Sequence, residues 1–163
     1  MKATNYWAVF MMAVFVTLIS CKTEVKQEEP QAEPKVAEVI EKTLYEKLGG
    51  AEGISAIVDD IVAEHLKNEN VSQFFQPLAD NPEHMATFKE HVRNFFGAGT
   101  GGSETYAGRD MPGAHKGLNI SEAEFMHATD DILLVLDRHK IEKDARNEVL
   151  AILFSMKWAV VRQ

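Results

Sequence analysis

From Thr43 onward, apolar residues recur every three or four positions along the chain, which is the spacing of an amphipathic α-helix. No run alternates between apolar and polar residues with the period of two expected of a half-buried strand. The pattern therefore predicts an all-α domain. The clearest stretch follows Gly49-Gly50, and its apolar face consists of Ile54, Ile57, Val58, Ile61, Val62, His65 and Leu66.

Start signals mark three further helices. Asn81-Pro82-Glu83 combines a capping side chain, a proline in the first turn and an early acid. Ser121–Glu124 matches a capping box, and a last helix begins near Glu142. The predicted inner faces of these three helices are Met85, Phe88, Val92, Phe95 and Phe96; Phe125, Ile132, Leu133 and Leu136; and Val149, Ile152, Leu153, Met156 and Val160.

Between the helix that starts at Asn81 and the helix that starts at Ser121 lies a glycine-rich stretch, Gly97–Gly108, which predicts a long irregular loop. Loops of this length in compact domains are usually functional or mobile. The helices and the loop together suggest a small helical sandwich built around a ligand. A plain helix bundle with an inert loop is the alternative.

The charge balance narrows the classes of partner. The chain has 17 Lys and Arg residues against 25 Asp and Glu residues, for a formal net charge of −8. Binding to nucleic acid needs a basic face that meets the phosphates, so this balance argues against a nucleic-acid partner. The single cysteine, Cys21, excludes an internal disulfide and a cluster of thiolate metal ligands.

Residues 1–20 have the pattern of a bacterial lipoprotein signal peptide. Lys2 precedes an uncharged apolar run from Trp7 to Ile19, which as a helix would cover about 20 Å of the ~30 Å hydrocarbon core of a bilayer. Leu18-Ile19-Ser20-Cys21 resembles the bacterial lipobox, whose cysteine is lipidated and becomes the mature N-terminus. We therefore expect Cys21 to anchor the protein to a membrane of the bacterial cell envelope, with the domain periplasmic or surface-exposed. An ordinary signal followed by a coincidental cysteine is the alternative.

Residues 21–42 differ in composition from the segments on either side. Pro30 and Pro34 interrupt a sequence dominated by Glu, Lys and Gln, which has little to bury. We expect a disordered linker that holds the folded domain, residues 43–163, away from the membrane.

The histidines are the candidate metal ligands, because lipidation would remove the only thiol. His115 stands out: it follows the glycine-rich stretch on what can only be a short helical turn, a position that suits a ligand to something flat and apolar. His84 and His91 lie two turns apart on one helix face and could clip a metal ion, whereas His139 is expected to face water. A di-iron site is disfavoured because Glu124–His127 is the only Glu-x-x-His motif. His65 and His127 are expected at the edge of the core.

Several short motifs, taken in order, resemble a group 1 truncated hemoglobin. They are Thr43-Leu44-Tyr45-Glu46-Lys47-Leu48-Gly49-Gly50, Phe74-Phe75, Gly101-Gly102, Tyr106-Ala107-Gly108-Arg109-Asp110-Met111 and Ala114-His115-Lys116-Gly117-Leu118. The resemblance covers Thr43–Val161. It implies a two-over-two helical sandwich around non-covalent haem b (iron protoporphyrin IX).

The resemblance also implies roles for individual residues. His115 corresponds to the proximal iron ligand, for which a neutral imidazole is suited. Phe75 corresponds to the phenylalanine that packs on the haem face, and Tyr106 and Arg109 either meet the haem propionates or stabilise the loop. The apolar walls of the pocket are expected to include Phe88, Val92, Phe96, Met111, Leu118 and Phe125.

On the distal side, the sequence departs from the family pattern. Val62 stands where the family usually has a tyrosine, and Phe88 and Val92 hold positions where glutamine is frequent. Counting back from Gly101-Gly102 places His91 where some members carry a histidine that binds the sixth position of the iron. His91 is thus expected to bind iron, to donate a hydrogen bond to a bound ligand, or to point to solvent, with His84 as the fallback.

The resemblance implies a haem-binding globin that reversibly binds oxygen or another diatomic ligand such as NO or CO. A second hypothesis is an enzyme that carries out NO dioxygenation or peroxide-linked oxidation with an external reductase. No Rossmann-type Gly-x-Gly-x-x-Gly motif is present to bind the reductant's cofactor. A third is electron transfer or redox sensing through a haem held by two histidines.

Overall fold

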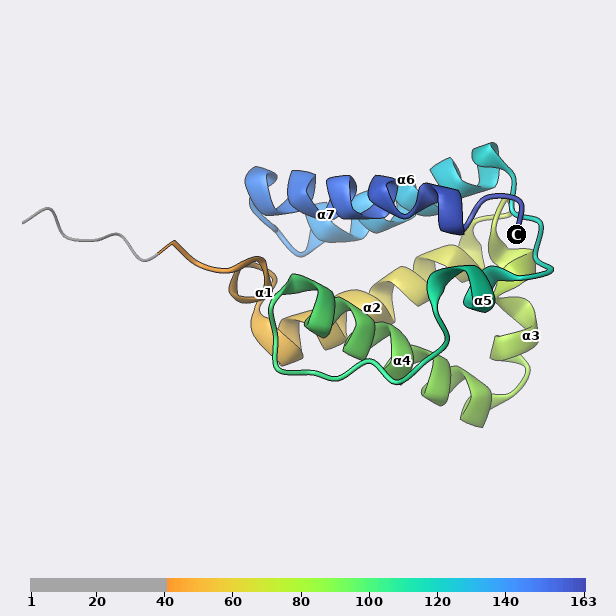
Figure 1. Cartoon of the computed structure of the whole chain (residues 1–163), viewed down its shortest axis with the longest axis horizontal. Helices are drawn as coiled ribbons and strands as arrows, with labels where there is room; N and C mark the ends of the chain where they lie inside the picture. The colour runs from red at the N-terminus through yellow and green to blue at the C-terminus, as the bar shows by residue number, and fades with distance from the viewer. Residues whose placement is uncertain (1–40) are drawn as a thin grey trace, which may run out of the picture. The chain divides into compact units, whose positions relative to one another are not determined.

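The computed structural model describes residues 41–163, so the predicted signal peptide, Cys21 and nearly all of the predicted linker lie outside the described residues. Within this range the secondary structure is helical, and none of its helices has the length and apolar character needed to cross a membrane. In chain order the elements are α1 (Leu44–Lys47), α2 (Gly50–Lys67), η1 (Ser72–Phe74), α3 (Gln76–Ala79), α4 (Pro82–Thr100), α5 (Met111–His115), α6 (Glu122–Arg138), α7 (Lys143–Ser155) and η2 (Lys157–Ala159) (Figure 1).

The four long helices form two layers. Helix α2 packs against α4 in one layer, and α6 packs against α7 in the other (Figure 1). Contacts between α2 and α6 join the two layers, while α5 packs on the η2 turn. This arrangement confirms the all-α, two-over-two sandwich expected from the sequence.

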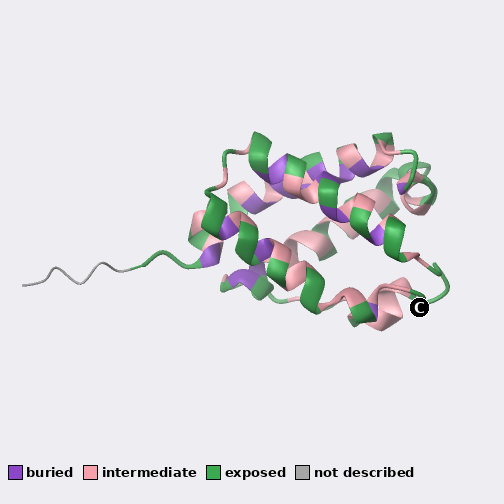
Figure 2. Ribbon diagram, turned by 90° about the horizontal axis from the view of Figure 1, so that it is seen from above, coloured by how far each residue is buried: buried purple, intermediate pink, exposed green. Residues whose placement is uncertain are grey.

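The tightly packed core occupies only part of the space between the layers. It is formed where α1, the first half of α2, the end of α6 and the start of α7 meet, and the buried residues face inward (Figure 2). Burial of such side chains contributes about 1.5–3 kcal/mol each. The buried core cluster comprises Leu44, Leu48, Ile54, Ile57, Val58, Ile61, Val135, Leu136, Ala145 and Val149.

Two of the three predicted helix starts, at Asn81 and Ser121, are confirmed by capping contacts. The Asn81 side chain accepts hydrogen bonds from the backbone N–H groups of Glu83 and His84, at 3.1 Å each. Ser121 and Glu124 form a reciprocal capping box on α6. Helix α7 begins directly after Glu142, close to the predicted start, but the Glu142 side chain makes no capping hydrogen bond. A second capping box, between Thr43 and Glu46, starts α1, a helix that the periodicity did not indicate.

The irregular loop begins later than predicted. Gly97–Thr100 continue α4, and the irregular segment starts at Gly101, whose φ of 96° requires the left-handed conformation that glycine adopts without strain. At the other end of the chain, α7 stops at Ser155. The inward residues Met156 and Val160 therefore lie before and after the η2 turn rather than on a continuous helix.

Gly102 allows the irregular segment to pack against the start of the domain. The Tyr45 hydroxyl donates a 2.7 Å hydrogen bond to Oε1 of Glu104, which holds the segment against α1. A Cβ atom at Gly102 would lie 2.1 Å from Oε2 of Glu104 and 2.5 Å from the Tyr45 ring. The absence of a side chain at Gly102 is therefore needed for this contact.

We predict that Gly102→Ala lowers the free energy of unfolding by about 1–3 kcal/mol, because the added methyl group displaces Tyr45 and Glu104. Gly99→Ala is the matched control: Gly99 is helical and a Cβ there meets nothing within 4 Å, so alanine should stabilise α4 by up to about 1 kcal/mol. Urea unfolding followed by circular dichroism checks both values. Equal stabilities for the two variants would contradict the packing role of Gly102.

Candidate functional site

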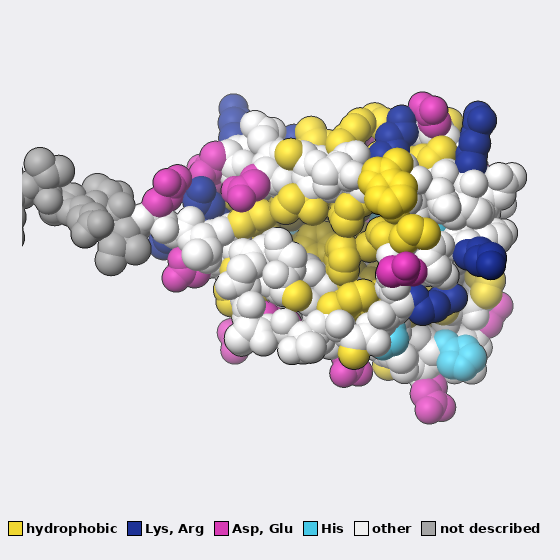
Figure 3. All heavy atoms as spheres, viewed as in Figure 1, with side chains coloured by type: hydrophobic (Ala, Val, Ile, Leu, Met, Phe, Trp, Pro, Cys, Tyr) yellow, Lys and Arg dark blue, Asp and Glu magenta, His cyan; other side chains and the backbone are white. Residues whose placement is uncertain are grey.

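A cavity of about 630 Å³ separates the two layers beyond the packed core. Its walls come from the second half of α2, the middle of α4, α5, the first half of α6 and the end of α7, and Figure 3 shows apolar side chains lining the hollow. The volume falls within the ~300–1,000 Å³ typical of small-molecule and cofactor sites. The lining includes every pocket residue proposed from the sequence, namely Phe75, Phe88, His91, Val92, Phe96, Tyr106, Arg109, Met111, His115, Leu118 and Phe125.

His115 ends the five-residue helix α5 and lines the cavity. Its Nδ1 lies 2.8 Å from the carbonyl oxygen of Met111. A carbonyl oxygen can only accept a hydrogen bond, so Nδ1 carries the proton and Nε2 keeps its lone pair. Nε2 has no hydrogen-bond partner among the described residues. The backbone of α5 therefore prepares this imidazole to act as a ligand.

Helix α5 is held in place at both ends. Before it, the Tyr106 hydroxyl donates a 2.6 Å hydrogen bond to the Arg109 carbonyl, and the Asp110 side chain accepts from the backbone N–H of Gly113 at 2.9 Å. After it, the backbone N–H groups of Gly117 and Asn119 both donate to the carbonyl of Gln163, at 3.1 and 3.2 Å. These contacts fix the position of His115 although α5 is too short to be stable alone.

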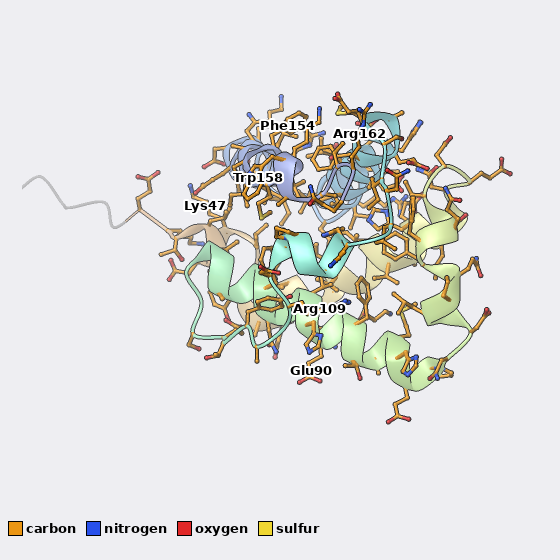
Figure 4. The ribbon with its side chains drawn as sticks, turned by 45° about the vertical axis from the view of Figure 1, so that its right-hand side comes forward. Lys47, Glu90, Arg109, Phe154, Trp158 and Arg162 are labelled. Atoms are coloured by element: carbon orange, nitrogen blue, oxygen red, sulfur yellow. The ribbon has the colours of Figure 1, made fainter. Side chains whose placement is uncertain are left out.

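His91 lies at the rim of the cavity. The residue lines the cavity but is exposed, and its ring meets the Tyr106 ring edge-on with centroids 6.3 Å apart. Figure 4 labels Arg109, on the loop ahead of α5, and Glu90, the neighbour of His91 on α4, below it. Coordination of a metal by His91 stays a prediction.

The cavity wall is apolar at the position where the family usually has a tyrosine. Val62 on α2 is 3% exposed and lines the cavity together with Ile61. Phe88 and Val92 of α4 line it too. The walls contributed by these two helices therefore offer a bound ligand few polar groups.

One polar group on these walls was not proposed from the sequence. His65 lines the cavity at 5% exposure, and its Nδ1 lies 2.9 Å from Oδ2 of Asp131 on α6. Asn68 donates to both carboxylate oxygens of Asp131, at 2.9 and 3.0 Å. Burial lowers the pKa of His65, although the contact with Asp131 acts in the opposite direction, so His65 is neutral at pH 7.

A signal for this pair exists in the sequence. His65 falls on the apolar face of the first long helix, and a buried imidazole requires a hydrogen-bond partner. Which carboxylate supplies that partner cannot be read from spacing, because Asp131 is 66 residues away. The expectation that His65 sits at the edge of the core understated its burial.

The remaining histidines lie away from the cavity. His84 is exposed at the start of α4, so the fallback position for a ligand does not reach the cavity. His127 does not line the cavity either. His139 was expected to face water, but its Nε2 lies 2.8 Å from Oδ2 of Asp60.

The arrangement suits a flat, largely apolar group that one imidazole can coordinate. The aromatic residues Phe75, Phe88, Phe95 and Phe96 are only half-buried because they border the cavity, and a bound apolar group would complete their burial. Arg109 is exposed and also lines the cavity, so its guanidinium can meet an anionic substituent there.

Comparison with known sequences identifies globins as relatives of this chain. The profile of the family described as "Bacterial-like globin" matches residues 43–162. A group 1 truncated hemoglobin of Synechocystis sp. is 31% identical over 114 residues, which is 68% of this chain and 88% of the relative. A group 1 truncated hemoglobin of Tetrahymena pyriformis is 28% identical over 112 residues, 69% of this chain and 88% of the relative.

Solved structures share the fold. The truncated hemoglobin of Tetrahymena pyriformis in its Fe(III) form superposes with a TM-score of 0.67 at 24% identity, covering 75% of this chain and all of that chain (100%). The 2/2 hemoglobin of Synechococcus sp., in the cyanomet state and with covalently attached heme, has a TM-score of 0.62 at 28% identity, covering 71% and 94% of the two chains. With the profile match spanning residues 43–162, the chain belongs to the bacterial-like globin family.

Proposed function

We propose that residues 43–163 bind haem b non-covalently and that His115 is its axial ligand. The observation that carries this proposal is the 2.8 Å hydrogen bond from Nδ1 of His115 to the Met111 carbonyl, which leaves the Nε2 lone pair free at a cavity of about 630 Å³. Neutral imidazole is the axial ligand of globins. The names of the related hemoglobins and the heme of the related Synechococcus structure support the binding of haem, while its non-covalent attachment and the role of His115 rest on the residues of this chain.

Other residues of the cavity have separate roles in this proposal. Phe75 is held between the ring of His65, with centroids 4.8 Å apart, and the edge of Phe88, at 5.9 Å, so its ring presents a fixed surface to the macrocycle. Arg109 lines the cavity and would pair with a haem propionate there. The apolar lining excludes water and favours the neutral, flat macrocycle over solvent.

We propose further that the protein reversibly binds a diatomic gas at this site. The bound haem would supply an iron atom able to take oxygen, NO or CO. The chain contributes the axial imidazole and an apolar pocket bordered by Val62, Phe88 and Val92. An external reductase would be needed to keep the iron in its ferrous form.

We predict that His115→Ala speeds haem loss by at least about 10-fold, equivalent to about 1.4 kcal/mol of binding free energy, because the iron loses its protein ligand. Transfer of haem to an excess of apomyoglobin measures the rate. His84→Ala is the control, since His84 is exposed and outside the cavity. Equal rates of haem loss from the two variants would rule out His115 as the ligand.

The apolar character of the Val62 position predicts fast oxygen release, because no hydroxyl group donates to bound oxygen from there. Val62→Tyr should slow oxygen dissociation about 3- to 10-fold relative to Val62→Phe, which has the same ring without the donor. Stopped-flow replacement of oxygen by carbon monoxide gives both rate constants. Identical rates would show that position 62 does not reach the ligand.

We also propose that Cys21 is lipidated and tethers the domain to a membrane of the bacterial envelope. The support is the sequence Leu18-Ile19-Ser20-Cys21 after an apolar run. Cys21→Ser should abolish incorporation of labelled palmitate and release the protein from the membrane fraction, whereas Ser20→Ala, which keeps a small residue at that position, should retain both. Membrane retention of an unlabelled Cys21→Ser protein would contradict the lipid anchor.

A further inference from the structure

His65, Asp131 and Asn68 form a buried hydrogen-bonded chain beside the cavity. Asp131 accepts from Asn68 through both carboxylate oxygens and lies 2.9 Å from Nδ1 of His65. Because an ionised carboxylate can only accept, Nδ1 carries the ring proton. The lone pair of the imidazole is therefore at Nε2, on the opposite edge of the ring.

Nε2 of His65 is open to the cavity. The side chain lines the cavity, and Nε2 has no hydrogen-bond partner among residues 41–163. In this range, the polar side-chain atoms that are both buried and without a partner are Nε of Arg93, Oε2 of Glu104 and Nε of Arg146. Nε2 of His65 is not one of them, so this atom is not fully buried. The atom is thus neither satisfied nor sealed, and it offers an acceptor to a molecule inside the cavity.

The other polar side chains around the cavity are already engaged or lie at its rim. The Tyr106 hydroxyl donates to the Arg109 carbonyl, and the Thr129 hydroxyl donates to the Phe125 carbonyl at 2.8 Å. Glu124 accepts from Ser121 and Gln73, and His91 is exposed. With His115 assigned to the iron, His65 is the buried side chain on these walls, among the described residues, that offers a free basic nitrogen.

The ring of His65 is fixed in orientation by two contacts. It stacks on Phe75 with an interplanar angle of 27°, and Asp131 holds Nδ1 from α6. The charged groups around it are Asp131 on α6 and Glu64 on α2, and Glu64 is itself bound by Arg138 at 2.6 Å. Asp131 would compensate a positive charge on the ring, so the pair can take up a proton without leaving a buried cation unpaired.

We propose that His65 is the proton acceptor for weak acids HX that enter the cavity and bind the haem as anions. The H–X bond breaks heterolytically: the proton moves to Nε2 of His65, and the electron pair stays with X⁻, which is left for the iron. The imidazolium keeps its Nδ1 hydrogen bond to Asp131 and donates from Nε2 to X⁻. The anion and Asp131 both favour the protonated ring once it forms. Hydrogen peroxide, hydrogen cyanide and hydrogen sulfide belong to this class of ligand, and the inference rests on haem binding as proposed above.

Cyanide binding to the ferric, haem-loaded protein tests the inference without any catalytic turnover. At pH 7.5 the ligand is hydrogen cyanide, and calorimetric titrations in phosphate and in Tris buffer give the number of protons released for each cyanide bound. The wild type should release none, because His65 retains the proton. His65→Gln keeps a donor to Asp131 but does not accept a proton at this pH, so it should release one proton per cyanide.

His84→Phe is the control, since His84 is exposed and outside the cavity, and it should behave as the wild type. His91→Phe tests the histidine at the cavity rim, and its readout is the proton count, which should stay at zero because His65 is still present. The rate constant for cyanide association should also fall roughly 10²-fold in His65→Gln, the lower range for loss of a general base. A second variant, His65→Phe, preserves the stack on Phe75 and should give the same proton count as His65→Gln.

Two outcomes would overturn the inference: release of one proton by the wild type, or retention of the proton by His65→Gln. Proton release by His91→Phe alone would transfer the role to His91 and overturn the assignment to His65. A protein that takes up no haem contradicts the proposed function itself, and its absorption spectrum reveals this before any cyanide is added.

Discussion

The structure depends on the two helical layers being packed together at one end and held apart at the other. At the packed end, Ile57, Val58, Val135 and Leu136 are buried at 0–1% exposure. At the other end, continuations of the same helices line a cavity of about 630 Å³ with apolar side chains. A ligand that fills the cavity removes this apolar surface from water and thereby stabilises the folded state. This geometry therefore couples the stability of the fold to cofactor binding.

Because the layers are separated around the cavity, the short elements between them position the residues that line it. Helix α5 has five residues and is positioned by its neighbours: the Tyr106–Arg109 contact before it and the backbone pairing with Gln163 after it. The Tyr45–Glu104 contact holds the segment that leads to α5 against the start of the domain. Together these contacts set where the Nε2 atom of His115 lies, while the Met111 carbonyl favours the tautomer with the proton on Nδ1.

Much of this arrangement could be predicted from the sequence, because helix periodicity and capping are local properties. The caps at Asn81 and Ser121 and the buried face of α2 appear as expected, and the motif resemblance supplied His115 and the other cavity residues. The end of α4 was predicted too early because Gly97 was assigned to the loop. Gly97 is helical, and its lack of a side chain leaves space for Glu104. The His65–Asp131 pair was missed because its partners meet only through tertiary packing.

The absorption spectrum of the purified protein, ferric and ferrous, with and without carbon monoxide, tests the central claim most directly. An apolar cavity that presents the free Nε2 of His115 should bind haem, so the protein should show a Soret band that shifts when carbon monoxide is added to the ferrous form. A protein that shows no Soret band after addition of haem, or a ferrous spectrum that carbon monoxide leaves unchanged, would contradict the account.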